Sequence, residues 1–352
     1  MSKNKKEKLK KLLGWEKEKL IKLENFKKGQ GSRIEDFKKV YDKIKEIDSI
    51  SDDRYVPIKN LETVIKNEKN ISLKDDKEGD SFLFSDWSLS QLCVRYKVPK
   101  RYIKHCLYKD SPELAAKNLN YWLKKENDDT KVLLRYDKFR KRLHGFLTER
   151  YGIFDDIEVF DIMDTSFSSD DYRVQSFFVS PEFTNIRIIQ DKKFYDDLSI
   201  GFNIRNSRVG RSSLYFEVLV YKWICSNGLI LGGGKATAYR RRHIDIEKNK
   251  VIREVKELTA DLPEIIENLK FKIEAAENNT LDDETLESML DNLKNKQKVS
   301  EKAISLAKEK LLDYGQTQWG LINGITEIAQ NYNLDTRYSL EKYAANLLRG
   351  TA

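Results

Sequence analysis

Residues 131–224 contain a series of apolar runs separated by short polar turns, and this series constrains the fold more than any other feature. The stretch KVLLRYDKFRKRLHGFLTERYG has two β-type runs on either side of a polar KFRK turn, which predicts a hairpin. Two further pairs of strands are predicted in YRVQSFFVSPEFTNIRIIQD and in SIGFNIRNSRVGRSSLYFEVLVYKWIC. Because successive strands joined by short turns pair antiparallel, we expect an antiparallel sheet.

Short helices are predicted before these strands. Ser85 or Asp86 can cap one helix, Pro99 stands at the start of a second, and Ser111 with Pro112 opens a third. Short helices followed by an antiparallel sheet predict an α+β fold.

Longer helical segments flank this core. Residues 5–28 have amphipathic spacing, and residues 33–47 predict a second helix. Downstream, residues 251–313 predict a helical hairpin with Thr280 as the N-cap of its second helix, and two more helices follow. The polar stretch 67–80 is typical of a linker. We therefore predict three parts, which are a basic helical N-terminal extension (1–75), an α+β core (76–250) and a helical C-terminal region (251–352).

The net charge of +8 is concentrated at the N-terminus. Residues 1–28 contain 11 lysines and four glutamates, a net of +7, which leaves about +1 for the rest of the chain. The protein is therefore not basic throughout, and any other positive surface must be a local patch. The apolar face of the N-terminal segment favours packing onto its own domain or onto a second subunit.

Several classes of protein are disfavoured by what the sequence lacks. No run approaches the roughly 20 apolar residues that span a bilayer, and no secretory signal pattern follows the basic N-terminus. The three cysteines and three histidines are scattered, which predicts neither a disulfide framework nor a metal site. We expect a reduced, cytoplasmic protein that uses no metal and no cofactor.

A glycine-rich segment, GGGK at 232–235, follows a predicted strand and invites comparison with a phosphate-binding loop. A Walker-type loop needs the pattern G-x-x-x-x-G-K-[ST]. Lys235 follows Gly234 here, but Leu229 stands where the first glycine belongs and Ala236 replaces the hydroxyl residue. The segment therefore does not predict nucleotide hydrolysis. Two interpretations remain, a glycine turn between elements and a loop that holds a backbone phosphate without cleaving it.

Three clusters of basic and aromatic residues occur at RYDKFRKRLHGF (135–146), RNSRVGR (205–211) and KATAYRRRH (235–243). Each cluster alone can be explained as a polar, solvated turn. Together, in a chain that is otherwise near neutral, they favour single-stranded nucleic acid, because cations bind phosphates and rings stack on bases. The predicted contact residues are Arg135, Tyr136, Lys138, Phe139, Arg140, Arg142, Arg205, Asn206, Arg208, Arg211, Lys235, Tyr239, Arg240, Arg241 and Arg242.

No catalytic constellation is predicted. The histidines at 105, 144 and 243 lack the neighbouring carboxylates of a triad or metal site. Cys225 ends an apolar run and is typical of buried packing. The acidic segment FDDIEVFD (154–161) has the spacing of a solvated helix face.

The middle of the chain resembles the phage/plasmid-like proteins of domain-of-unknown-function family 932. The resemblance covers about residues 80–245, and more loosely the tail that contains TQWGLINGITEIA. Its most specific parts are the pattern formed by Asn206, Ser207 and Gly210 and the CSNG pattern at 225–228. The resemblance supplies no set of catalytic residues. It implies a protein of mobile elements and viruses, which favours a role in replication, in recombination or in counteracting host defence.

We therefore expect a non-catalytic nucleic-acid-binding protein, encoded by a phage or plasmid, that binds or anneals single strands in replication or recombination. We expect DNA in preference to RNA, and a homo-oligomer in the cytoplasm of a bacterial host. Two alternatives stay open. One is a structural or protein-interaction protein of a mobile element, and the other is an enzyme that processes a nucleotide or nucleic acid with the glycine-rich loop.

Overall fold

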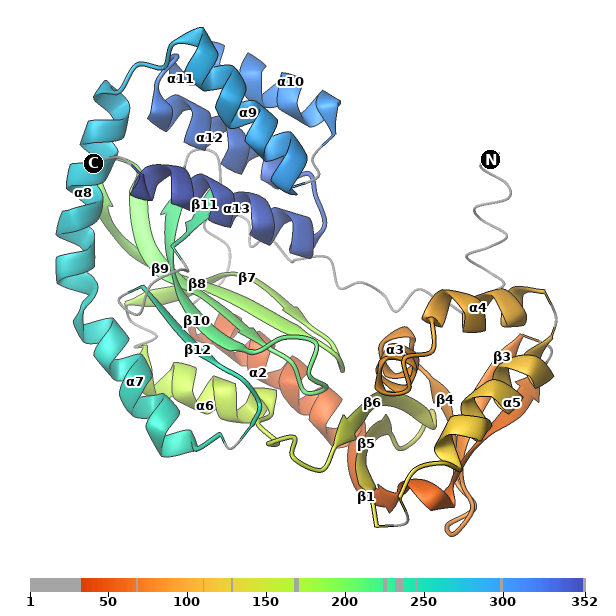
Figure 1. The fold of residues 1–352 in the computed structure, drawn as a ribbon. Helices are drawn as coiled ribbons and strands as arrows, with labels where there is room; N and C mark the ends of the chain where they lie inside the picture. Colours follow the sequence, from red (N-terminus) through yellow and green to blue (C-terminus); the bar gives the residue numbers. More distant parts are fainter. Residues whose placement is uncertain are drawn as a thin grey trace.

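The computed structural model of the 352-residue chain contains helices and two mainly antiparallel sheets, which confirms the predicted α+β class (Figure 1). The structure describes residues 33–67, 69–109, 111–127, 129–167, 171–223, 227–231, 237–244, 246–297 and 300–350. The predicted helix at 5–28 and the glycines at 232–234 lie outside these ranges. None of the helices within them is long and apolar enough to cross a bilayer.

The first sheet has six strands in the order β1-β5-β6-β4-β3-β2. Neighbouring strands pair antiparallel except β4 and β6, which are parallel. The strands are β1 (Ser51–Pro57), β2 (Leu61–Asn67), β3 (Asn70–Asp75), β4 (Ser81–Phe84), β5 (Lys131–Asp137) and β6 (Arg142–Thr148). A short 3₁₀ helix, η1 (Ile58–Asn60), joins β1 to β2.

Three helices cover this sheet, namely α3 (Asp86–Arg95), α4 (Lys100–Tyr108) and α5 (Pro112–Leu123). Ser85 caps α3 as predicted, because its hydroxyl accepts the backbone N–H of Ser88. Pro112 opens α5, but the Ser111 side chain makes no capping hydrogen bond. The apolar sides of the helices and of the sheet form one core, which includes Leu73, Phe82, Leu92, Leu119 and Leu134.

The expected division at residue 75 differs from the observed sheet. Strands β1, β2 and β3 lie before that boundary, yet they form half of the first sheet together with β4, β5 and β6. The stretch 67–80, which is typical of a linker in sequence, forms the β2–β3 turn, strand β3 and the turn into β4. Strand β3 was not predicted because its stretch of sequence is rich in charged residues. Asp75, for example, is buried and paired with Arg54 at 3.5 Å.

The second sheet has the order β11-β10-β9-β8-β7, with β12 paired to the other end of β10. All pairs are antiparallel, so the two hairpins predicted between 172 and 222 are confirmed. The strands are β7 (Tyr172–Val179), β8 (Thr184–Tyr195), β9 (Leu198–Asn206), β10 (Leu214–Lys222), β11 (Asn227–Ile230) and β12 (Ala238–Arg241).

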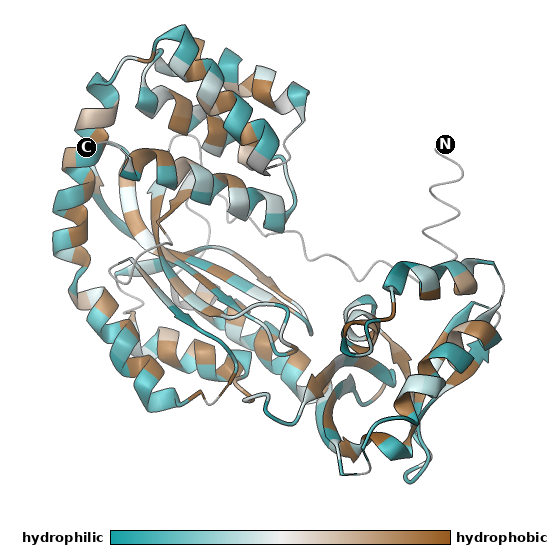
Figure 2. Ribbon diagram, viewed as in Figure 1, coloured by the Kyte–Doolittle hydropathy of each residue, from teal (hydrophilic) through white to brown (hydrophobic). Residues whose placement is uncertain are grey.

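The two faces of the second sheet differ in polarity. Alternate residues such as Phe202, Ile204, Phe216 and Val218 are fully buried in the larger core, where they join residues of α2 (Arg33–Ile50) and α6 (Asp156–Ser166). Between them on the strands stand polar residues, and the ribbon therefore alternates between apolar and hydrophilic positions (Figure 2). Helix α2 precedes the first sheet in the chain but packs against β7 of the second.

The C-terminal region is helical as predicted. It contains α7 (Lys248–Ala260), α8 (Leu262–Asn278), α9 (Asp283–Gln297), α10 (Glu301–Glu309), α11 (Leu311–Tyr314), α12 (Gln318–Ala329) and α13 (Leu334–Arg349). Helices α8 and α9 reverse direction near 280, but the expected N-cap was wrong. Asp282 accepts the N–H of Thr285, whereas Thr280 forms a β-bridge with Thr317. Helix α13 lies across the polar face of the second sheet (Figure 1).

Candidate nucleic-acid interface

Two of the arginines predicted to bind phosphate, Arg135 and Arg208, are buried at the junction of the two sheets. Arg135 is 3% exposed and donates to both carboxylate oxygens of Asp53 and of Asp155 at 2.7–2.9 Å. Arg208 donates to Asp48 and Asp155. Burial alone would lower the pKa of the Arg135 guanidinium. The hydrogen bonds to Asp155 and Asp53 outweigh this effect and raise the pKa. Both guanidinium groups are thus occupied within the protein and lie outside the proposed interface.

The acidic segment at 154–161 is correspondingly less solvated than expected. Asp155 is the N-cap of α6 and forms a capping box with Glu158. Asp156 is fully buried and accepts hydrogen bonds from the Thr184 hydroxyl and the Asn206 amide. Burial raises the pKa of Asp156. These carboxylates therefore belong to the interior and to the sheet junction rather than to a solvated face.

Three other predicted contact residues are also buried. The Tyr136 hydroxyl donates to Asp52 at 2.9 Å, and its ring packs on Phe82. Asn206 donates to the Phe154 carbonyl at 3.1 Å. The ring of Tyr239 is 8% exposed and packs in the core of the second sheet. Burial removes these side chains from any surface that a ligand reaches.

The Asn206-Ser207-Gly210 pattern shapes a loop. The Ser207 hydroxyl donates to the Glu182 carbonyl and accepts the N–H groups of Val209 and Arg211. Gly210 has φ = +72°, a conformation that favours glycine, and its N–H is donated to the Tyr151 hydroxyl. The pattern therefore fixes the connection between β9 and β10.

The turn of the β5–β6 hairpin remains exposed. Phe139 is 74% exposed, the Lys138 ammonium lies 5.4 Å from its ring centre, and the Arg140 side chain is 79% exposed. The buried Asp137 carboxylate accepts the N–H groups of Phe139 and Arg140 and thereby holds the turn. Arg142 lies half-buried at the start of β6. The turn belongs to the first sheet, whereas the other predicted clusters belong to the second.

Three side chains of the second sheet lie in one row across neighbouring strands. Arg205 and Arg240 were predicted from the sequence, and Tyr215 was not. The strand register aligns Arg205 on β9 with Tyr215 on β10, and Tyr215 with Arg240 on β12. Directly aligned residues of neighbouring strands point to the same face. The Tyr215 ring centre is 5.7 Å from the Arg205 guanidinium and 5.3 Å from that of Arg240. Tyr215 was missed in the sequence because it lies inside an apolar run.

Two more rings complete this arrangement around Arg205. The Tyr338 ring of α13 lies 3.9 Å from the guanidinium, and the Phe183 ring lies 5.2 Å from it. We call Phe183, Arg205, Tyr215, Arg240 and Tyr338 the cation–aromatic strip. Neither arginine of the strip makes a hydrogen bond or an ion pair with any residue that the structure describes. Their planes are held by rings while their N–H groups stay unused.

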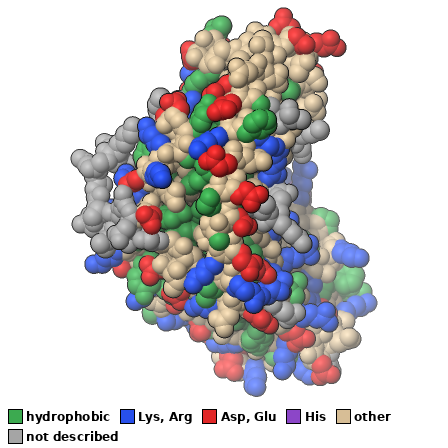
Figure 3. Space-filling model, turned by 90° about the vertical axis from the view of Figure 1, so that its left-hand side faces the viewer, with side chains coloured by type: hydrophobic (Ala, Val, Ile, Leu, Met, Phe, Trp, Pro, Cys, Tyr) green, Lys and Arg blue, Asp and Glu red, His purple; other side chains and the backbone are tan. Residues whose placement is uncertain are grey.

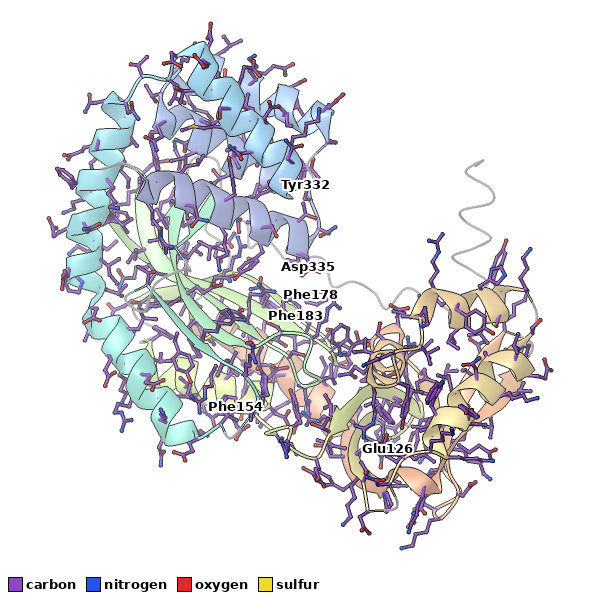
Figure 4. The ribbon with its side chains drawn as sticks, viewed as in Figure 1. Glu126, Phe154, Phe178, Phe183, Tyr332 and Asp335 are labelled. Atoms are coloured by element: carbon purple, nitrogen blue, oxygen red, sulfur yellow. The ribbon has the colours of Figure 1, made fainter. Side chains whose placement is uncertain are left out.

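Arg211 extends the strip toward one end of the sheet. Its guanidinium lies 5.8 Å from the Phe183 ring centre, 3.7 Å from Glu182 and 3.5 Å from Asp335. Phe178 and Phe183 lie together at this end, close to the start of α13, where Asp335 is located (Figure 4). Of the remaining predicted residues, Arg241 is half-buried and Arg242 exposed at the end of β12, and Lys235 lies outside the described residues.

A buried polar network on the same sheet face holds the strip in place. Glu217, which is fully buried, accepts hydrogen bonds from Asn203, from Lys342 and from the Tyr338 hydroxyl at 2.7 Å. Burial and the neighbouring Glu217 carboxylate raise the pKa of Tyr338, so Tyr338 stays a neutral donor. Its ring is therefore held in place against Arg205.

A second buried group anchors α13 to the sheet. Glu341, fully buried, binds Arg187 of β8 at 2.5 Å and 2.9 Å and Arg337 at 2.8 Å. Although burial opposes ionisation, Arg187 and Arg337 lower the pKa of Glu341. Two arginines share this carboxylate, so the three side chains carry a formal net charge of +1 on the sheet face that also carries the strip.

The glycine of the CSNG pattern lies against this group. A Cβ on Gly228 would come 2.8 Å from the Leu219 side chain and 3.5 Å from Arg187 Nη1. A side chain at this position therefore requires the buried Leu219 side chain to shift, so glycine suits the close approach of β11 to the anchor. The pattern therefore has a structural role on the sheet, whereas Cys225 lies outside the described residues.

No metal centre accompanies the strip: the described ranges contain no group of three or more His, Cys, Asp or Glu that could hold an ion. What the strip presents is two guanidinium groups packed beside aromatic rings.

His243, which is buried, stacks on Tyr151 at 5.2 Å, and both of its ring nitrogens lack hydrogen-bond partners among the described residues. Burial lowers the pKa of His243 to about 4.

Fold and strip together define the class, an α+β protein with two mainly antiparallel sheets, one of which carries a cation–aromatic face. The chain belongs to the family described as Domain of unknown function (DUF932), whose model matches residues 143–349. The match starts in β6 and includes the second sheet and helices α7 to α13, which confirms the family resemblance in the core and in the C-terminal tail, although the match begins at residue 143 and the resemblance at about residue 80. No curated protein and no solved structure matches the chain significantly.

Proposed function

We propose that this protein is a non-catalytic nucleic-acid-binding protein that holds single strands, DNA in preference to RNA, on the cation–aromatic strip. The observation that carries the proposal is the pair of guanidinium groups, Arg205 and Arg240, that flank the Tyr215 ring without an acidic partner among the described residues. Phosphates are bound bidentately by such arginines. Bases stack on aromatic rings and on guanidinium planes. Within the strip Arg240 is exposed, whereas Arg205, Tyr215 and Tyr338 are half-buried, and Phe183 is buried and supports Arg205 from inside the protein.

The anchoring of α13 supports the same proposal. Because Glu217 and Glu341 fix the helix that carries Tyr338, little side-chain freedom is lost when a strand binds. In the cell, the protein acts on phage or plasmid DNA in the bacterial cytoplasm, where it binds or anneals strands during replication or recombination. It works as a homo-oligomer, since annealing is helped when several copies hold one strand.

The proposal is tested by titrating the full chain with labelled single-stranded DNA and RNA at two salt concentrations. Wild-type affinity falls with salt, and the Arg205→Ala/Arg240→Ala variant loses about 1.4 units of the log–log salt slope, since each phosphate contact to a single strand contributes about 0.7. Arg253→Ala serves as the matched control, because Arg253 is an exposed arginine of α7 that faces Glu257 at 4.0 Å. Absence of binding, or binding that does not respond to salt, overturns the proposal.

A further inference from the structure

Exposed aromatic residues gather on α4 and α5, away from the strip. Among the residues that the structure describes, fourteen large hydrophobic side chains are exposed, and five of these lie on the two helices. We call these five the helical patch, and they are Tyr102, Tyr108, Leu114, Tyr121 and Trp122. Four of the five are aromatic, which is unusual for an ordinary solvated helix.

Four members of the helical patch, Tyr102, Leu114, Tyr121 and Trp122, form one part of the surface. Leu114, Asn118 and Trp122 are spaced four apart and share one side of α5. Tyr102 of α4 interacts with Asn118, which joins the two helices. The Tyr121 and Trp122 rings meet edge to face with their centres 5.1 Å apart. The opposite side of α5, with Ala115, Leu119 and Leu123, is buried against the first sheet.

Several cations near these rings have no acidic partner among the residues that the structure describes. The Lys125 ammonium lies 4.7 Å from the Tyr121 ring centre, and that of Lys109 lies 5.9 Å from Tyr108. No ion pair to a described residue is made by Arg101, Lys109, Lys117, Lys124 or Lys125. By contrast, Lys100 and Lys104 are paired with Asp86, and Arg95 is paired with Glu126.

The combination also occurs at the β5–β6 turn, where the exposed ring of Phe139 lies beside Lys138, but there it involves a single ring. Figure 3 shows the side of the molecule formed largely by α7 and α8, where acidic and basic side chains are interspersed. Phe271 of α8 is 67% exposed, but the neighbouring Lys270 is paired with Glu267 at 2.7 Å. Within the described residues, several exposed rings beside cations without an ion pair are therefore gathered on α4 and α5, whereas the β5–β6 turn has one such ring, Phe139.

The charge of the helical patch identifies its partner. Lysine is depleted at the centres of protein–protein interfaces, whereas a polyanion is bound by several cations at once. Interleaved rings add stacking on bases. We propose that α4 and α5 form a second surface for single-stranded nucleic acid, so that one chain holds two strand segments. This inference rests on the function proposed for the strip and gives each chain the two strands that annealing requires.

The test is the binding stoichiometry of an oligonucleotide of about 8 nucleotides, short enough to occupy a single surface. Wild-type protein is expected to bind two per chain. The Tyr121→Ala/Trp122→Ala variant is expected to bind one, with affinity for the other weakened about tenfold or more. The strip variant Arg205→Ala/Arg240→Ala is expected to retain the site on α4 and α5.

Two further variants keep the test decisive. Lys117→Glu/Lys125→Glu changes only exposed side chains and is expected to have the same effect, while Phe271→Ala is the matched control and binds two. If wild-type protein binds one oligonucleotide and only the strip variant loses it, the second surface is refuted and the proposed function stands. If wild-type protein binds none, both proposals fail.

Discussion

The anchor of α13 allows a quantitative test, the replacement of Glu341 by glutamine. The substitution keeps the size of the side chain but removes the carboxylate that Arg187 and Arg337 share. All three side chains are at most 5% exposed, so water cannot replace the lost partner. Leaving buried charges uncompensated in this way costs about 3–5 kcal/mol, far above the value of a surface pair.

Urea unfolding measures this cost. With an m-value of about 3 kcal/mol/M, the midpoint of Glu341→Gln is expected to fall by ~1–2 M at unchanged m. Strand binding weakens as well, because α13 no longer holds Tyr338 against Arg205. A triple change of Arg187, Glu341 and Arg337 to methionine restores much of the midpoint, since no charge is then buried.

The control is Glu267→Gln, which removes an exposed pair with Lys270. Its midpoint stays at the wild-type value. If the midpoint of the Glu341 variant matches that of this control, the buried group does not anchor α13, and the rigidity of the strip cannot be attributed to it.

Two further predictions concern the interior. Because burial lowers the pKa of His243 to about 4, its unfolded form binds a proton that the folded form does not, so stability is lost as pH falls from 6.5 to 4. This contribution to the free energy of unfolding amounts to ~3 kcal/mol. In the His243→Phe variant, the urea midpoint is therefore expected to change less between pH 6.5 and pH 4 than it does in the wild-type protein. Gly228→Ala places a Cβ 2.8 Å from Leu219 and is expected to cost about 1–3 kcal/mol in urea unfolding, whereas Gly350→Ala, with no contact under 3.6 Å, leaves the midpoint unchanged.

Local sequence patterns predicted the hairpins and most of the helices, but not strands β1 to β4 or the long-range partners of the elements. The hairpins between 131 and 222 follow from β-type runs and short turns, which are properties of neighbouring residues. Strands β2 and β3, LETVIKN and NISLKD, look polar, and their place is set by pairing within a larger sheet. Arg135 looked like a surface cation because its partner Asp53 lies 82 residues away.

The strip was partly predictable. Arg205 and Arg240 were named from the basic clusters, but Tyr215, Tyr338 and Phe183 were not. A signal existed in β10, where Tyr215 and Glu217 alternate with Phe216 and Val218 and so mark a second, polar face. Tyr338 could not be found this way, because only the packing of α13 onto the sheet brings it to Arg205.

The position of α2 has a consequence for synthesis of the chain. Helix α2 ends at Ile50, but β7, against which it packs, begins only at Tyr172, which is 122 residues later. At about 5–20 residues per second, a ribosome needs on the order of 10 s to make the intervening chain. During that interval the apolar side of α2, with Phe37, Val40 and Ile44, has no partner from the second sheet. The first sheet, made of residues 51–148, can therefore fold before α2 has its partner. The larger core, which includes α2, forms after the second sheet has been synthesised.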